Sequence, residues 1–181
     1  FAKEITISSS ITAKTCVIHD KHLVVAGDST TPNTIYYSGT SDIDDFTTTG
    51  SGTIALDDKV IGLKSFREDL IIFCQNSIYK LENINNSSTI VITPITQNVG
   101  CLANHSIQEI GGDLVFLSPD GVRTLAGTVR IGDVELGSVS RQIQSIINTI
   151  ADGMDSFLIS TVVLRRKSQY RLFYTTTAEG S

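Results

Sequence analysis

The sequence predicts an all-β fold, and within that class a partial β-propeller of antiparallel three- to four-stranded blades with one inserted α-helix. Ile, Val and Thr dominate the segments between closely spaced turn signals, and β-branched side chains favour strands. The apolar runs LIIF at 70–73 and LVFL at 114–117 have no polar face, as expected of strands covered on both sides. A strand–turn–strand–turn–strand pattern recurs from 60–81 to 104–125, and an offset of 44 residues is typical of propeller blades.

Turn signals of Gly, Asn and Asp divide the chain into short segments, and each segment rich in β-branched residues is an expected strand. The expected strands are 15–19, 22–26, 34–38, 60–65, 69–74, 77–81, 89–96, 106–110, 113–118, 121–126, 157–164 and 170–175.

One segment, 139–151, has helical periodicity instead. Its apolar side chains recur at i, i+4, i+7, i+8 and i+11. They are Val139, Ile143, Ile146, Ile147 and Ile150. Ser138 or Ser140 can cap the start of this helix, and Gly153 can end it. The polar face carries only Arg141, too little charge for a membrane-surface helix, so we expect the helix to cover a sheet edge.

The repeat identifies a proposed blade core. At the offset of 44 residues, apolar positions of one copy meet apolar positions of the next. The proposed core is Leu63, Phe66, Leu70, Ile72, Phe73, Ile78 and Leu81 in the first copy, and Ile107, Ile110, Leu114, Phe116, Leu117, Val122 and Leu125 in the second. Segments 16–27 and 157–176 share the pattern more weakly.

We therefore expect all of 1–181 to be a fragment of a β-propeller domain. The blade-like units are 15–57, 58–100, 101–137 and 156–176, with the helix at 139–151 between the last two. Four blades are the usual minimum for a ring, and these partial blades cannot close one. The remaining blades are expected outside this chain.

Composition excludes several classes of protein. Lys and Arg number 14 against 19 Asp and Glu, a net charge of −5 that argues against wrapping a phosphate backbone. No apolar run approaches the roughly 18 residues that span a bilayer. Cys16, Cys74 and Cys101 are far apart with no CxxC pair, and the histidines complete no His/Cys cluster, so we expect reduced thiols, no metal and no cofactor.

Two acidic motifs have structural explanations. Asp42, Asp44 and Asp45 lack the Gly and Glu that a calcium loop requires, so we expect a turn with Asx hydrogen bonds, closed by Phe46. The Ser-Pro-Asp-Gly turn at 118–121 is like the Asp-box of sialidases but lacks its aromatic residue, and a hairpin turn accounts for it.

No catalytic constellation emerges from the sequence. Glycoside hydrolysis needs a second carboxylate that converges with Asp120, and none is identifiable. Arg165, Arg166 and Lys167 are expected at a solvated hairpin tip. There is no GxGxxG, no phosphate-binding loop and no nucleophile elbow. We expect a protein that is not an enzyme.

An ordered series of motifs resembles one known group of proteins. The motifs are N-x-I-Y-x-S at 33–38, an acidic turn ending in Phe at 42–46, G-L-x-x-F-R-x-x-L-I-x-F at 62–73, S-I-Y-x-L at 77–81, N-V-G-C at 98–101, D-L-V-F-L-S-P-D-G-V at 113–122 and S-x-x-I-x-x-I-I at 140–147. Over roughly 17–176 the chain resembles the propeller segment of short-tailed bacteriophage tail tubular (nozzle) proteins and of the related packaged-DNA stabilisation, or tail-hub, proteins.

The resemblance implies a structural virion protein, made in the bacterial cytoplasm and assembled into the phage tail. It implies a homo-oligomeric, hexameric ring that contacts an adaptor and fibres, and through which viral DNA passes without sequence-specific binding. It implies no catalytic residues, no cofactor and no membrane insertion. An acidic wall suits such a conduit, because it does not retain phosphates.

Two other functions are compatible with a propeller. The first is a carbohydrate-binding or glycan-cleaving propeller, although the absence of Trp weakens a sugar-stacking platform. The second is a cellular propeller that mediates protein interactions.

Overall fold

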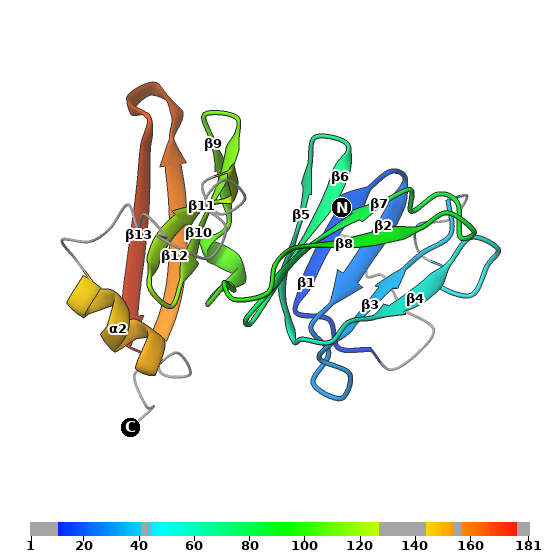
Figure 1. The fold of residues 1–181 in the computed structure, drawn as a ribbon, viewed down its shortest axis with the longest axis horizontal. Coiled ribbons are helices and arrows are strands. Elements are labelled where there is room, and N and C mark those ends of the chain that lie inside the picture. The colour runs from blue at the N-terminus through cyan, green and yellow to red at the C-terminus, as the bar shows by residue number, and fades with distance from the viewer. Residues whose placement is uncertain (1–10, 41–42, 44, 127–143, 154–156, 177–181) are drawn as a thin grey trace, which may run out of the picture.

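The computed structural model describes residues 11–40, 43, 45–126, 144–153 and 157–176, which form four antiparallel sheets in chain order (Figure 1). The first sheet contains β1 (Thr15–His19), β2 (His22–Ala26), β3 (Thr34–Tyr37) and β4 (Gly52–Ala55). The second contains β5 (Val60–Phe66), β6 (Asp69–Cys74), β7 (Ile78–Glu82) and β8 (Val91–Thr96). The third contains β9 (Gln108–Ile110), β10 (Asp113–Ser118) and β11 (Gly121–Thr124). The fourth is the hairpin of β12 (Phe157–Leu164) and β13 (Gln169–Thr176).

Each sheet is a meander, in which strands that follow each other along the chain pair antiparallel. β1 contacts β5, β5 contacts the 3-10 turn Asn104–Ser106 that precedes β9, and β9 contacts β12, so neighbouring sheets meet at or next to their first strands. Sheets that direct their first strands to a common centre are arranged like the blades of a propeller. The described chain is therefore mostly β, with antiparallel sheets that resemble propeller blades.

A hydrophobic layer joins the first sheet to the second. Val24 and Ile35 from the first sheet are fully buried in it, as are Leu70 and Ile72 from β6. Because side chains alternate along a strand, the intervening Ile71 and Phe73 lie on the opposite face of β6. That face belongs to a second layer, and β6 is consequently covered on both sides.

The second layer joins the second sheet to the third. The rings of Phe73 and Phe116 lie at its centre, with centroids 5.1 Å apart and ring planes inclined by 58°. Leu114 and Ile78 are fully buried around them. Such a tilted aromatic pair contributes more than its buried area alone.

A third layer is formed by the third sheet, the hairpin and α2 (Gln144–Asp152). Leu117 comes from β10, Ile147 and Ile150 from the helix, and Ile159 from β12, and all of them are buried. The helix therefore packs on a sheet, as its periodicity predicted.

Tight turns determine the strand pairing at one end of the molecule. Asp20 and Lys21 between β1 and β2 both have positive φ, at 51° and 71°, and Gly111 and Gly112 between β9 and β10 have φ of 62° and 78°. Two successive positive φ values define the two-residue turn whose twist matches that of a hairpin. The β1–β2, β5–β6, β9–β10 and β12–β13 turns all lie at the same end of the molecule (Figure 1).

Some elements differ from the sequence predictions. The strand β4 was not predicted, because it is short and begins at Gly52 in a Gly-rich segment. Strand 106–110 begins only at Gln108, since Asn104–Ser106 forms a 3-10 turn in which Ser106 Oγ donates to the carbonyl oxygen of Ala103 at 2.6 Å. Helix α2 extends one residue past the predicted end. Positions 127–143, which include both predicted caps, Val139 and Ile143, lie outside the described residues.

Candidate functional site

The proposed blade core lies mainly in the hydrophobic layers between the sheets. The positions that are at most 8% exposed are Leu63, Leu70, Ile72, Phe73, Ile78, Leu81, Ile107, Leu114, Phe116, Leu117 and Leu125. Phe66, Ile110 and Val122 are half-buried. Phe66 packs at the margin of the second layer, and its ring supports the guanidinium carbon of Arg67 at 5.0 Å.

Residues 44 apart occupy equivalent places in the second and third sheets. Leu70 pairs with Leu81 across β6 and β7, and Phe73 pairs with Ile78. In the third sheet, Leu117 pairs with Val122 and Phe116 with Arg123, which leaves Leu114 level with Leu125. The equivalent side chains also face in corresponding directions. Leu70 packs against the first sheet and Leu114 against the second, so each points to the sheet that precedes its own.

The hairpin presents an uncovered apolar surface on its outer side. Leu158, Val162 and Phe173 are 61%, 45% and 55% exposed. Ser160 pairs with Phe173, and Val162 pairs with Arg171, so these side chains lie on one face of the hairpin. Ile159 and Leu172, on the other face, pack into the third layer. We call the group Leu158, Val162 and Phe173 the hairpin face.

The hairpin face is the best-defined candidate interaction surface in the described part of the chain. Every earlier sheet has its corresponding face covered by the sheet that follows it. An exposed apolar patch of this kind is typical of a protein interface. This face was not predicted from the sequence. Both hairpin strands carry apolar residues on both sides, and that pattern is the signal that could have identified it.

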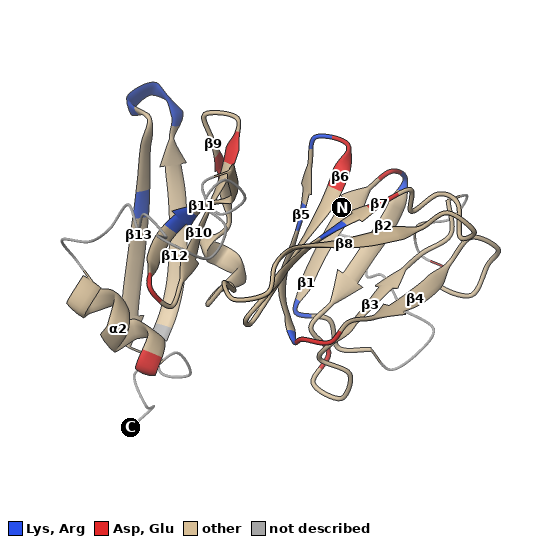
Figure 2. Ribbon diagram, viewed as in Figure 1, with Lys and Arg blue, Asp and Glu red and all other residues tan. Residues whose placement is uncertain are grey.

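The basic cluster lies at the tip of the same hairpin. Arg165–Lys167 forms a 3-10 turn between β12 and β13, and all three side chains are exposed. Figure 2 shows basic residues gathered there, whereas the β5–β6 turn carries both basic and acidic residues. The predicted position at a hairpin tip is confirmed.

Polar side chains connect the first sheet to the second near the β1–β2 turn. His19 Nδ1 lies 2.8 Å from Ser65 Oγ. His22, which is fully buried, lies with Nε2 3.1 Å from Asn85 Oδ1, and Asn85 Nδ2 donates to Asp20 at 2.7 Å. Burial lowers the pKa of His19, against the opposing effect of the Asp20 carboxylate. The ring is therefore suited to accept a hydrogen bond from the Ser65 hydroxyl in its neutral form.

A cavity of about 530 Å³ opens beside this connection. Its charged and polar lining comes from the ends of four strands, and includes His19, Asp20, Arg67, Glu68, Asp69 and Glu82. Lys80 contacts two of these carboxylates, at 3.0 Å from Glu82 and 3.9 Å from Asp69. Arg67 donates to the carbonyl oxygen of Gly112 in the third sheet. The Lys80 contacts lie within the second sheet, whereas the Arg67 contact joins the second sheet to the third.

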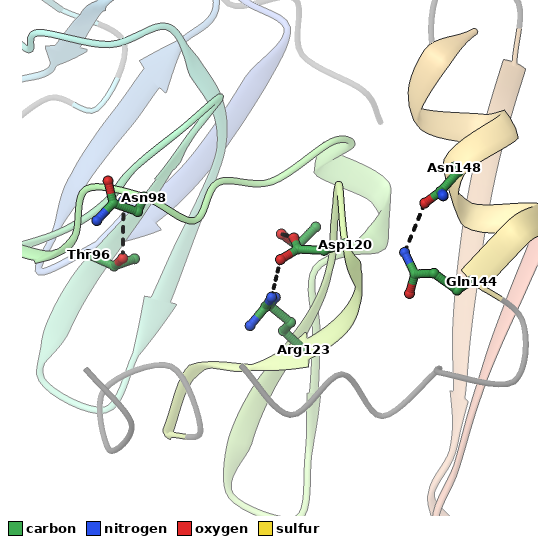
Figure 3. Close-up of polar contacts among 7 residues, drawn as sticks. Thr96, Asn98, Asp120, Arg123, Gln144 and Asn148 are labelled. Atoms are coloured by element: carbon green, nitrogen blue, oxygen red, sulfur yellow. Dashed lines mark hydrogen bonds and ion pairs between the residues drawn. The ribbon is translucent and has the colours of Figure 1, made fainter. Parts of the chain in front are cut away.

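The Ser-Pro-Asp-Gly segment closes the β10–β11 hairpin, as predicted, with Ser118 paired to Gly121. Asp120 and Arg123 face each other and form an ion pair (Figure 3). Arg123 is almost fully buried, whereas Asp120 is half-exposed, and Ser118 Oγ also donates to Asp120 at 3.0 Å. The Asp120 carboxylate is thus engaged in holding the turn and a buried guanidinium.

The acidic segment near residue 45 is a turn in its described part. Asp45 Oδ1 accepts hydrogen bonds from the amide and the hydroxyl of Thr47, at 2.7 and 2.6 Å, which is the predicted Asx turn. These bonds lower the pKa of Asp45. Asp42 and Asp44 lie outside the described residues. Over the part of the chain that the structure describes, no group of three or more His, Cys, Asp or Glu residues could hold a metal ion.

The three cysteines have different environments. Cys74 and Cys101 are buried, and burial raises the pKa of their thiols to about 12 and about 11, whereas Cys16 is exposed. All three are free thiols. Among the described helices, none is both long and apolar enough to cross a membrane.

No family model matches the chain, and no curated protein matches it. Among solved structures, the crystal structure of the N-terminal domain of Nup159 is similar, with a TM-score of 0.45 and 14% sequence identity. The similarity covers 91% of this chain and 45% of that one, so this chain spans less than half the length of the structure that it matches.

Proposed function

We propose that this chain is a structural component of the tail of a short-tailed bacteriophage, in the nozzle or hub that conducts DNA during ejection. The observation that carries the proposal is the stack of blade-like sheets that ends in the uncovered hairpin face. Such a stack is built to pack against further protein, and its three described layers hold apolar side chains rather than reactive groups.

The assignment to a phage tail rests on the ordered motifs. Their described parts lie on structural elements of successive blades: N-x-I-Y-x-S on β3, G-L-x-x-F-R-x-x-L-I-x-F on β5 and β6, and D-L-V-F-L-S-P-D-G-V on β10 and β11. The motifs therefore describe blade construction, and their order along the chain is what favours this group over other propellers.

The proposed partners follow from the same group. The chain is proposed to contribute to a hexameric homo-oligomeric ring that contacts an adaptor and fibres. The apolar hairpin face supports packing against protein, and the net charge of −5 suits a wall past which DNA moves without being held.

Cryo-EM of the parent particle tests the proposal directly. We expect density for this fold in a ring at the distal end of the tail. Density in the capsid shell, or absence of the chain from purified virions, would contradict it.

A complementation assay tests the role of the hairpin face. A phage with a nonsense mutation in this gene is supplied with the Val162→Asp variant, and we expect filled heads that lack complete tails. Ser87→Asp, which places the same charge on an exposed loop residue, should restore infectivity. Normal tails with Val162→Asp would show that the face is not an assembly surface.

A further inference from the structure

A second cavity lies at the opposite end of the stack from the hairpin turns, where the innermost strands begin. Its volume is about 510 Å³, within the range of sites that bind small ligands or short peptides. The lining comes from the residue before β1, the connection between β2 and β3, the start of β5, and the segment that leads into β9. The lining includes Lys14, Lys59, His105, Val60, Ile61 and Leu102.

The two lysines have free ammonium groups in an otherwise acidic chain. In the described residues, neither Lys14 nor Lys59 forms an ion pair, and both side chains are exposed. Their main chains are nevertheless fixed, because Lys14 donates its amide to Ala26 and the carbonyl oxygen of Lys59 accepts from Gln75. The backbone at both positions is anchored, whereas the charges remain available to a ligand.

The carboxylate in the cavity wall does not neutralise these lysines by direct contact. Asp28 is 3% exposed and accepts hydrogen bonds from the amide of Thr12, at 2.7 Å, and from the amide and hydroxyl of Thr30, both at 2.6 Å. Its oxygens are directed at these donors. His105 also lines the cavity, and its imidazole can donate a hydrogen bond.

Another part of the cavity lining is apolar, and we call it the floor. Val60 is buried, Ile61 and Leu102 are half-buried, and all three line the cavity. An apolar floor flanked by cations suits a ligand that has carboxylates beside an aliphatic or aromatic side chain. A bare inorganic anion would leave this floor unused.

We propose that this cavity binds a short acidic peptide segment of a partner protein, with carboxylates on Lys14 and Lys59 and an apolar side chain on Val60 and Ile61. A polynucleotide fits less well, because the chain as a whole carries −5 and would repel the phosphates that extend beyond the cavity. The site is separate from the hairpin face and does not depend on the proposed function.

The test uses fluorescence anisotropy with a fluorescein-labelled peptide of alternating glutamate and leucine. The full chain is compared with the double variant Lys14→Gln/Lys59→Gln and with the control Lys21→Gln/Lys167→Gln. The control removes the same charge from exposed lysines in two hairpin turns at the other end. Circular dichroism establishes that both double variants are folded.

We expect the cavity variant to lose about tenfold or more in affinity and the control to stay within about twofold of the unchanged chain. A peptide of alternating glutamate and serine should bind more weakly than the leucine peptide, because it cannot use the floor. Equal losses in the two double variants, or absence of binding at roughly 1 mM peptide, would overturn the proposal. Tighter binding of a single-stranded oligonucleotide through the same lysines would overturn the assignment to a peptide.

Discussion

The aromatic pair between the second and third sheets provides a quantitative test of the stacked arrangement. Phe73 and Phe116 are both fully buried, and they come from strands that do not share a sheet. Phe116→Ala removes a ring from between the second and third sheets. The strands within each sheet are hydrogen-bonded to one another, so the sheets cannot readily move together to fill the space. We therefore expect a loss of roughly 3–5 kcal/mol in the free energy of unfolding.

Part of that loss belongs to the ring pair itself. Tilted aromatic pairs contribute about 0.5–1.5 kcal/mol beyond their burial, so the double-mutant cycle of Phe73→Ala and Phe116→Ala should show a coupling of that size. Urea unfolding followed by circular dichroism and tyrosine fluorescence gives the values, since the chain has five Tyr and no Trp. Coincident curves from the two probes establish that the transition is two-state.

An exposed phenylalanine on the same chain is the matched control. Phe173→Ala should change the free energy of unfolding by no more than about 0.5 kcal/mol, because that ring is 55% exposed. Two results would contradict the stacked arrangement: a loss of less than about 1 kcal/mol for Phe116→Ala, or additive losses for the two core variants. Either result would mean that the second and third sheets do not pack through these rings.

Three further predictions concern ionisable groups. Hydrogen bonds from Thr30 and Thr12 lower the pKa of Asp28 from 3.8 to about 2, so its stabilising contribution should be present above pH 4 and lost as the pH falls towards 2. Asp28→Asn should flatten acid unfolding in that window, and an unchanged profile would contradict the assignment. Burial lowers the pKa of His19 below 6.5, so His19 should favour the folded state above that pH and oppose it below. His19→Gln should therefore reduce the pH dependence of the melting temperature, measured in melting curves at a series of pH values. Cys74 and Cys101 should resist a thiol reagent at pH 8 in the folded chain, because their pKa values are raised to about 12 and about 11; mass spectrometry should find only Cys16 modified until denaturant is added.

The strands and the repeat could be predicted because their signals are local. Turn residues such as Gly111 and Gly112 mark hairpin ends, and side-chain alternation along β6 and β10 places the same positions in equivalent layers. The helix was recognisable from its periodicity, although Ile146, which belongs to the predicted apolar face, is 41% exposed. The third layer covers Ile147 and Ile150 instead, and sequence spacing alone does not show where a neighbouring sheet ends.

The candidate surfaces were not predictable in the same way. His19 and Ser65 are 46 positions apart, and His22 and Asn85 are 63 apart, so no local pattern connects them. The cavity at the start of the inner strands brings together Lys14 and Lys59, which are unremarkable charged residues in sequence. The hairpin face depends on which side of a two-sided apolar hairpin is covered, and that is decided by the third layer rather than by the hairpin itself.

The burial of β6 on both sides affects how faithfully the chain can fold. A slip of one residue would exchange Leu70 and Ile72 with Ile71 and Phe73, and every exchanged side chain would still be apolar. Hydrophobicity alone therefore corrects such an error weakly. The register of β5 and β6 is fixed instead by the two-residue turn that begins at Arg67, whose φ is 58°. We expect damage to this turn to yield compact, misregistered and aggregating chains rather than a native fold of lowered melting temperature.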